Sequence, residues 1–186
     1  MTNAPEPASQ GLTRLERTYN ASPETIWDLW TTEAGIESWW APDGFTTKVR
    51  QLELRPGGLL VYAMTAMAPE QVEFMKNAGL PLTNESRKTF TEVAPPKRLA
   101  YRSLIDFVPG HEPYEHLTVV DIEPDGDRTK VTMTVEPMHD GEWTGRLVAG
   151  RSNELDNLAK VVERRAEAQV RSHADRFGPT RRQPGS

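Results

Sequence analysis

Hydrophobic and polar residues alternate with a period of two through much of the chain before residue 136. This alternation is typical of strands that bury one face of a sheet, and residues that favour tight turns separate the runs. The loops between successive later runs are short, which predicts an antiparallel meander. The predicted strands are Leu12–Tyr19, 44–55, Leu59–Met67, Arg87–Val93, Arg98–Val108, Tyr114–Ile122 and Thr129–Val135.

Apolar residues spaced three and four apart predict helices between and after these strands. Ser22 is a natural N-cap with Pro23 at the first helical position, so we expect a short helix there and a second one at Glu33–Trp40. Residues 68–79 predict an inserted helix, which is a candidate lid over a cavity or a candidate contact between two subunits.

The segment from residue 140 to about residue 174 contains no proline and predicts one long helix. Asp140 is expected to be its N-cap. Gly150, in the middle of this helix, costs about 1 kcal/mol relative to alanine, and it indicates either a close approach or a gap at that point. The apolar face is formed by Trp143, Leu147, Gly150, Leu155, Leu158 and Val162.

The order of these elements predicts an α+β helix-grip fold. A curved antiparallel sheet of about six to seven strands wraps around the long C-terminal helix, and two short helices follow the first strand. We expect one domain at residues 12–170, between a disordered leader at 1–11 and a disordered basic tail at 171–186. Where sheet and helix do not touch, a cavity forms between them.

Two adjacent tryptophans, Trp39 and Trp40, precede a Pro-Asp-Gly turn. Two indoles are a large apolar load to expose beside a turn. We expect either that both pack against the sheet, or that one enters the core and the other lines the mouth of a cavity.

The candidate ligand-binding residues combine apolar bulk with a few polar groups on strands or on the helix face. A slip of one residue in strand 59–67 would bury Val61 and Ala63 instead of the candidates on that strand. The candidates are Trp40, Tyr62, Met64, Tyr101, Ser103, His116 and Trp143.

Composition and spacing exclude several kinds of site. The chain has no cysteine, which excludes disulfides and thiolate chemistry. His111, Glu115 and His116 are close in sequence, but Glu115 and His116 point to opposite faces of a strand, so we expect no metal and no cofactor.

Charge and hydropathy limit the partners. A net charge of -5 argues against nucleic acid, although residues 163–186 hold six arginines against three acidic residues. No apolar run approaches the roughly 20 residues of a membrane helix, and the start of the chain lacks the features of a signal peptide. We therefore expect a cytoplasmic protein, either a monomer or a homodimer, with no membrane insertion.

Several motifs together resemble the SRPBCC (START-like) superfamily, and within it the activator of Hsp90 ATPase homologue family. The resemblance covers about Leu12 to Ala166. The segments that carry it are ASPETIW at 21–27, WWAP at 39–42, RPGG at 55–58, EVAPPKRL at 92–99, DFVPG at 106–110 and MHD at 138–140.

The resemblance implies a helix-grip fold with an internal apolar cavity for a small hydrophobic or aromatic molecule, such as a lipid or polyketide. One alternative is an enzyme of the aromatase/cyclase or hydrolase type, in which His116 would act with Asp106, Tyr62 or Tyr101. Another is a chaperone-related or stress-response interaction module. Because the domain starts within about a dozen residues, we expect no activation of Hsp90 itself.

Overall fold

Seven strands and four helices make up the protein in this computed structural model, which describes residues 11–176. Most of the predicted leader and tail therefore lies outside the described residues, and the domain limits stay a prediction. The elements are β1 (Thr13–Tyr19), α1 (Pro23–Thr31), α2 (Glu33–Trp39), β2 (Phe45–Leu52), β3 (Leu59–Ala66), α3 (Pro69–Asn77), β4 (Thr83–Ala94), β5 (Arg98–Ile105), β6 (Tyr114–Asp125), β7 (Arg128–Val135) and α4 (Gly141–Arg176).

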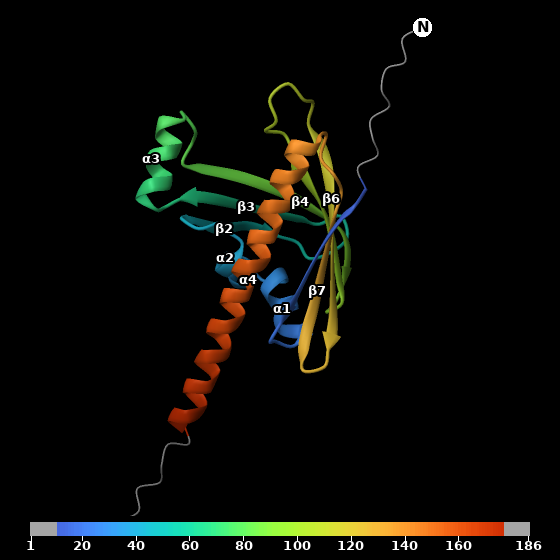
Figure 1. The fold of residues 1–186 in the computed structure, drawn as a ribbon, viewed down its shortest axis with the longest axis vertical. Coiled ribbons are helices and arrows are strands. Elements are labelled where there is room, and N and C mark those ends of the chain that lie inside the picture. The colour runs from blue at the N-terminus through green and yellow to red at the C-terminus, as the bar shows by residue number, and fades with distance from the viewer. Residues whose placement is uncertain (1–10, 177–186) are drawn as a thin grey trace, which may run out of the picture.

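The strands form one antiparallel sheet in the order β1-β7-β6-β5-β4-β3-β2, which confirms the predicted meander from β2 to β7. The first two strands lie at opposite edges, so α1 and α2 carry the chain from one edge to the other. The register shifts between Val49 and Gln51 and between Phe90 and Glu92. Such irregularities bend strands, and they fit the curvature of the sheet in Figure 1.

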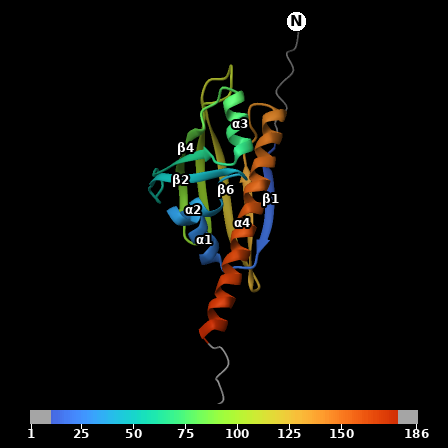
Figure 2. The same cartoon turned by 90° about the vertical axis from the view of Figure 1, so that its left-hand side faces the viewer.

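Helix α4 covers the concave face of this sheet and runs on beyond it at its C-terminal end (Figures 1 and 2). Leu155, Leu158, Val161 and Val162 are buried in the same core cluster as the inward residues of the strands. The Tyr19 hydroxyl of β1 donates a hydrogen bond of 2.8 Å to the backbone carbonyl of Leu155. The predicted helix-grip fold is therefore present.

Side chains cap the helix starts where the sequence predicts them. The backbone N–H of Thr25 donates to Ser22 Oγ at 3.2 Å, and that of Trp143 donates to Asp140 Oδ1 at 2.8 Å. Each cap satisfies a backbone donor that the first turn of a helix leaves without a partner.

Several strand limits differ from the prediction: β2 ends at Leu52 and not at residue 55, and β6 runs on to Asp125. Strand β4 begins at Thr83, four residues before the predicted start, because it stays paired with β3 up to Thr65. Strand β5 ends at Ile105 and not at Val108, since the last residue leaves the sheet to pack in a small cluster with Met138.

Of the two expectations for the adjacent tryptophans, packing of both in the core is the one observed. Both are buried, with 3% of Trp39 and 1% of Trp40 exposed. Trp39 Nε1 donates to the carbonyl of Leu29 at 2.9 Å, which ties α2 to α1. The rings lie 5.0 Å apart between centroids and pack as one aromatic unit under the sheet.

The insert between β3 and β4 forms α3, which projects from the sheet in Figure 1. It holds to the rest of the protein through the buried Met75, whereas Phe74 is exposed. Gly79, with φ of 67°, follows its end, as expected for a residue that must leave a helix in the left-handed conformation. None of the helices in residues 11–176 is long and apolar enough to span a membrane.

Replacing the cap of α4 tests how firmly this helix is anchored. We expect D140A to lower the free energy of unfolding by about 1 kcal/mol, because the Trp143 N–H loses its acceptor. Urea denaturation followed by circular dichroism measures this. The matched variant D140N should keep most of the stability, since asparagine caps as well as aspartate; equal losses in both variants would mean that charge and not capping matters.

Candidate functional site

A cavity of about 200 Å³ lies between the sheet and the N-terminal half of α4. One part of its wall is apolar and another carries charged or hydroxyl groups. Its lining residues are Tyr62, Ser86, Arg87, Lys88, Ser103, Leu104, Ile105, Phe107, Leu147, Gly150, Arg151 and Glu154. We call this space the α4 cavity.

Gly150 lines the α4 cavity and has no side chain to fill it. A Cβ atom added to this glycine would meet nothing within 4 Å, so the residue marks a gap and not a close approach. The core residues that fill the sheet–helix interface begin at Leu155, about one turn further along α4.

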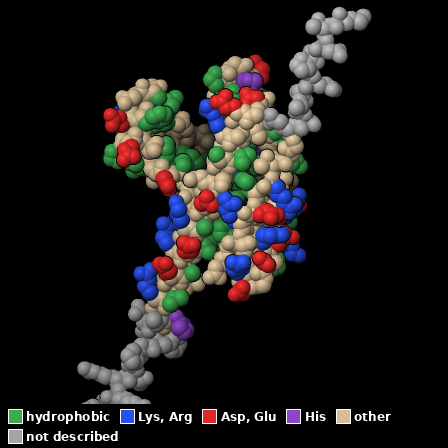
Figure 3. Space-filling model, in the orientation of Figure 1, with side chains coloured by type: hydrophobic (Ala, Val, Ile, Leu, Met, Phe, Trp, Pro, Cys, Tyr) green, Lys and Arg blue, Asp and Glu red, His purple; other side chains and the backbone are tan. Residues whose placement is uncertain are grey.

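The α4 cavity adjoins a wider hollow of about 620 Å³, with which it shares Ser86, Arg87, Leu104 and Phe107. Figure 3 shows this hollow as a deep recess between the α3 projection and the lobe that contains the β5–β6 loop. The hollow gives the α4 cavity a route to solvent.

A buried lysine stands on the cavity wall. Lys88 lies on β4 on the same face as Phe90, and only 3% of it is exposed. The register pairs Lys88 with Ser103 and Ser103 with His116, which makes a polar row across β4, β5 and β6. Lys88 Nζ donates a hydrogen bond of 2.8 Å to Ser103 Oγ.

Three aromatic rings surround the Lys88 amine. Their centroids lie 4.9 Å (Tyr101), 5.7 Å (Trp40) and 5.8 Å (Tyr62) from Nζ. Ring faces at such distances attract a cation. Burial raises the pKa of both tyrosines above the ordinary value, so at neutral pH neither is an anion that could balance the lysine.

Lysine is almost never fully buried without an ionic partner, yet no carboxylate in the described part of the chain forms an ion pair with Lys88. Burial lowers the pKa of Lys88 to about 7, and the positive charge of Arg151 acts in the same direction, while Glu154 opposes them. Near neutral pH this amine therefore exists in both its charged and its neutral form.

Arg151 faces Lys88 from α4 and is 7% exposed. Its Nη1 donates to both carboxylate oxygens of Glu154 at 2.8 Å. The Nε of Arg151 is buried and has no acceptor within residues 11–176. The pair is neutral as a unit, which leaves the Lys88 charge without a counter-ion.

The structure brings four of the candidate residues from the sequence together around Lys88. Tyr62 and Ser103 line the α4 cavity, and the Trp40 and Tyr101 rings pack against the amine. Both faces of β3 are buried here: Tyr62 belongs to the main core cluster, while Val61 and Ala63 are also inaccessible.

The other three candidates lie elsewhere. Met64 packs against the core from a partly buried position, and Trp143 packs on the small cluster that contains Ile105. His116 is next to Ser103 on the sheet, but it does not line the α4 cavity.

His116 is held as a neutral imidazole. Its Nε2 lies within hydrogen-bond distance of the Glu136 carbonyl oxygen, and since a carbonyl can only accept, Nε2 carries the proton. Burial lowers the pKa of His116. No hydrogen bond joins it to Asp106, Tyr62 or Tyr101 in the described residues, so the acid–base set of the enzyme alternative is not assembled.

The histidines of the β5–β6 loop and of the approach to α4 meet in a separate cluster. The rings of His111 and His139 stack with centroids 4.0 Å apart, and the Tyr114 hydroxyl is 2.8 Å from His139 Nδ1. Among residues 11–176 no group of three histidine, aspartate or glutamate side chains is arranged to hold a metal ion.

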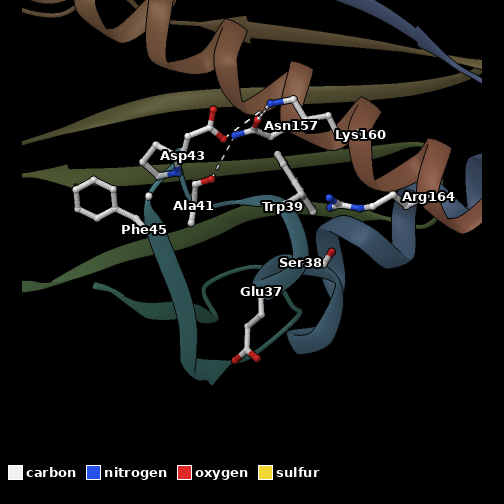
Figure 4. Close-up of a pocket in the computed structure, with 11 residues that line it drawn as sticks. Glu37, Ser38, Trp39, Ala41, Asp43, Phe45, Asn157, Lys160 and Arg164 are labelled. Carbon is white, nitrogen blue, oxygen red and sulfur yellow. Dashed lines mark hydrogen bonds and ion pairs between the residues drawn. The ribbon is translucent and has the colours of Figure 1, made fainter. Parts of the chain in front are cut away.

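A second pocket, of about 210 Å³, lies further along α4, between that helix and the turn after α2, and is drawn in Figure 4. Its central polar group, Asn157, donates to the Ala41 carbonyl and to Asn153, and it accepts from Lys160. Because these groups satisfy one another, this pocket is best explained as the polar junction between α4 and the turn after α2.

Sequence reasoning missed Lys88 and Arg151, although a signal for each was present. Lys88 alternates with Phe90, so it shares the face of a core residue. Arg151 stands four residues before Leu155 and lies on the apolar stripe of α4. A single charged residue on an apolar face indicates a site only when the strand register and the helix position show that no residue of opposite charge lies beside it.

A curved antiparallel sheet that grips a long C-terminal helix over a cavity defines the helix-grip class of START-like, or SRPBCC, proteins. Residues 20–163 match the family of activator of Hsp90 ATPase homolog 1-like proteins. The chain belongs to this family, as its turn and core motifs indicated. It has no match among curated proteins.

Solved structures of several bacterial proteins share the fold. A protein from Chromobacterium violaceum is 22% identical over 82% of this chain and 96% of its own, with a TM-score of 0.65. The AHSA1 protein from Silicibacter pomeroyi is 19% identical over 82% and 98%, with a TM-score of 0.64. A protein from Mycobacterium smegmatis is 16% identical over 87% and 97%, also at 0.64. At these identities the likeness establishes the fold alone.

The buried lysine predicts an unusual pH dependence of stability. Below about pH 7 both the folded and the unfolded chain hold the Lys88 proton, and the cost of the buried charge is fully present. Between about 7 and the ordinary value of 10.5 only the unfolded chain holds it, so the stability of the wild type rises with pH. The shift corresponds to roughly 5 kcal/mol at most.

Replacing Lys88 by methionine removes this contribution. We expect K88M to be more stable than the wild type near pH 6 and its advantage to shrink toward pH 10, as measured by urea denaturation across that range. K97M, which removes an exposed lysine from the β4–β5 turn, is the matched control and should follow the wild type. A constant difference between K88M and the wild type at all pH values would show that Lys88 titrates normally.

Proposed function

We propose that this protein reversibly binds a small hydrophobic or aromatic molecule in the α4 cavity. The observation that carries the proposal is the α4 cavity itself, which lies beside Gly150 between β3, β4, β5 and α4 and is lined in part by aromatic and aliphatic side chains. The fold, which other members of the superfamily use to hold apolar ligands, supports it.

The size and lining of the cavity suit such a ligand. An apolar cavity of about 150 Å³ accommodates benzene, so about 200 Å³ fits one aromatic ring or a compact two-ring body. Leu104, Ile105, Phe107 and Leu147 supply apolar contact area. Larger groups on the ligand would extend into the adjoining hollow.

The hollow gives the ligand access from solvent. It lies between the start of β4 and the β5–β6 loop, and the exposed ring of Phe107 lines both the hollow and the α4 cavity. An apolar molecule that approaches through the hollow meets this ring on its way to the cavity. No residue of α3 lines either space, so the lid expected from the sequence stays a prediction.

Filling the gap at Gly150 tests the proposal. We expect the neutral two-ring probe 2-naphthamide to bind the wild type, and G150F to weaken its affinity at least tenfold, because the new ring occupies the α4 cavity. Isothermal titration calorimetry measures both affinities. Native mass spectrometry of the freshly purified wild type adds a search for a co-purified small molecule.

G145F is the matched control. Gly145 also lies on α4 with nothing within 4 Å of an added Cβ, but it does not line the α4 cavity, so G145F should bind the probe like the wild type. Thermal unfolding checks that both variants fold. Equal affinity of G150F and G145F for the probe, or no binding to the wild type at all, contradicts the proposed function.

A further inference from the structure

The charges around the α4 cavity do not balance. Three cationic residues line its wall, the buried Lys88 and Arg151 and the exposed Arg87, and Glu154 brings one carboxylate. Both oxygens of that carboxylate already accept from Arg151. A buried cation without a counter-ion is costly, since desolvation of the charge is not repaid by attraction to an anion.

Hydrogen-bond donors are also in excess at the same place. Lys88 Nζ has three donor positions, of which one is used on Ser103. Arg151 Nε is a further buried donor with no acceptor within the described residues, on a side chain that is 93% buried. The charged lysine and the arginine cannot accept a hydrogen bond, so only a group with acceptor atoms satisfies them.

Apolar side chains line the cavity opposite these donors. Leu104, Ile105 and Phe107 come from β5 and the loop after it, and Leu147 comes from α4. A molecule that complements both parts has an apolar body and one acidic group. The cationic groups lie on β4 and α4, so one carboxylate between the two elements can contact both.

We infer that the ligand of the α4 cavity is a small aromatic or aliphatic acid, whose anionic group is bound by Lys88 and Arg151. This inference rests on the proposed function and adds the chemical class of the ligand to it. The anionic group of the ligand forms an ion pair with Lys88 and accepts a hydrogen bond from the free Nε–H of Arg151. Ser103 holds the Lys88 amine in place.

Protonation of Lys88 couples to binding of such an acid. The groups that face this amine are Tyr62 and Tyr101 from the sheet and Arg151 and Glu154 from α4. His116, beyond Ser103, is neutral near pH 7 because its pKa is lowered. A bound anion favours the charged lysine, so above about pH 7 binding takes up a proton, and affinity for the acid falls as pH rises.

Two probes of the same shape test the inference. The carboxylate 2-naphthoate and its neutral amide 2-naphthamide differ in charge and share the two-ring body. For the full-length wild type near pH 6 we expect calorimetry to show naphthoate binding at least tenfold more tightly than naphthamide, with the preference declining from about pH 7 to pH 9. Titrations near pH 8 in buffers with different ionisation enthalpies should show proton uptake with naphthoate alone.

The K88M variant should lose the preference for naphthoate over naphthamide, whereas K97M should keep it. The inference is overturned, and the proposed function stands, if the wild type binds naphthamide and naphthoate with equal affinity. The same holds if K88M still binds naphthoate more tightly than naphthamide. If neither probe binds the wild type, the proposed function fails and the inference falls with it.

Discussion

The packing of α4 against the concave face of the sheet is the constraint on which the rest of this structure depends. Seven antiparallel strands leave one apolar face, and α4 is the helix that runs along it. From Leu155 to Val162 the helix fills that face with aliphatic side chains. One turn earlier Gly150 has no side chain to offer, and the α4 cavity is the result.

The buried charge of Lys88 lowers the stability of the fold. A methionine or leucine in place of Lys88 would suit the aromatic rings of Trp40, Tyr62 and Tyr101 without any desolvation cost. The cation–π contacts and the Ser103 hydrogen bond offset part of that cost, but the lowered pKa shows that they do not remove it. A buried charge kept at such a cost is characteristic of functional sites.

Membership of the activator of Hsp90 ATPase homolog 1-like family explains the architecture and does not specify the chemistry. The motifs that place the chain in the family build turns, caps and the aromatic core. The residues that distinguish the α4 cavity, Lys88 and Arg151, lie outside those motifs. The proposed binding role therefore rests on side chains that the family's fold positions but that the family's motifs do not include.

The order of elements, the meander, the caps at Ser22 and Asp140 and the inserted helix were predictable from the sequence, because turn residues, capping and periodicity act over a few neighbours. Strand limits such as the start of β4 were missed, since pairing with β3 and not local composition sets them. Aromatic candidates such as Tyr62 and Tyr101 were found because bulky rings on an alternating strand are usually turned inward.

Only the tertiary structure decided what those rings surround. The sequence by itself determined that an apolar sheet face and a long helix exist. It also indicated that Gly150, within that helix, marks either a close approach to the sheet or a gap. Which of the two it is, and that Lys88 meets Arg151 across the space without a carboxylate of its own, follows from register and helix placement. Whether a charge is balanced depends on the residues that surround it in space. Lys88 and Arg151 are 63 positions apart in the chain, so only folding brings them together.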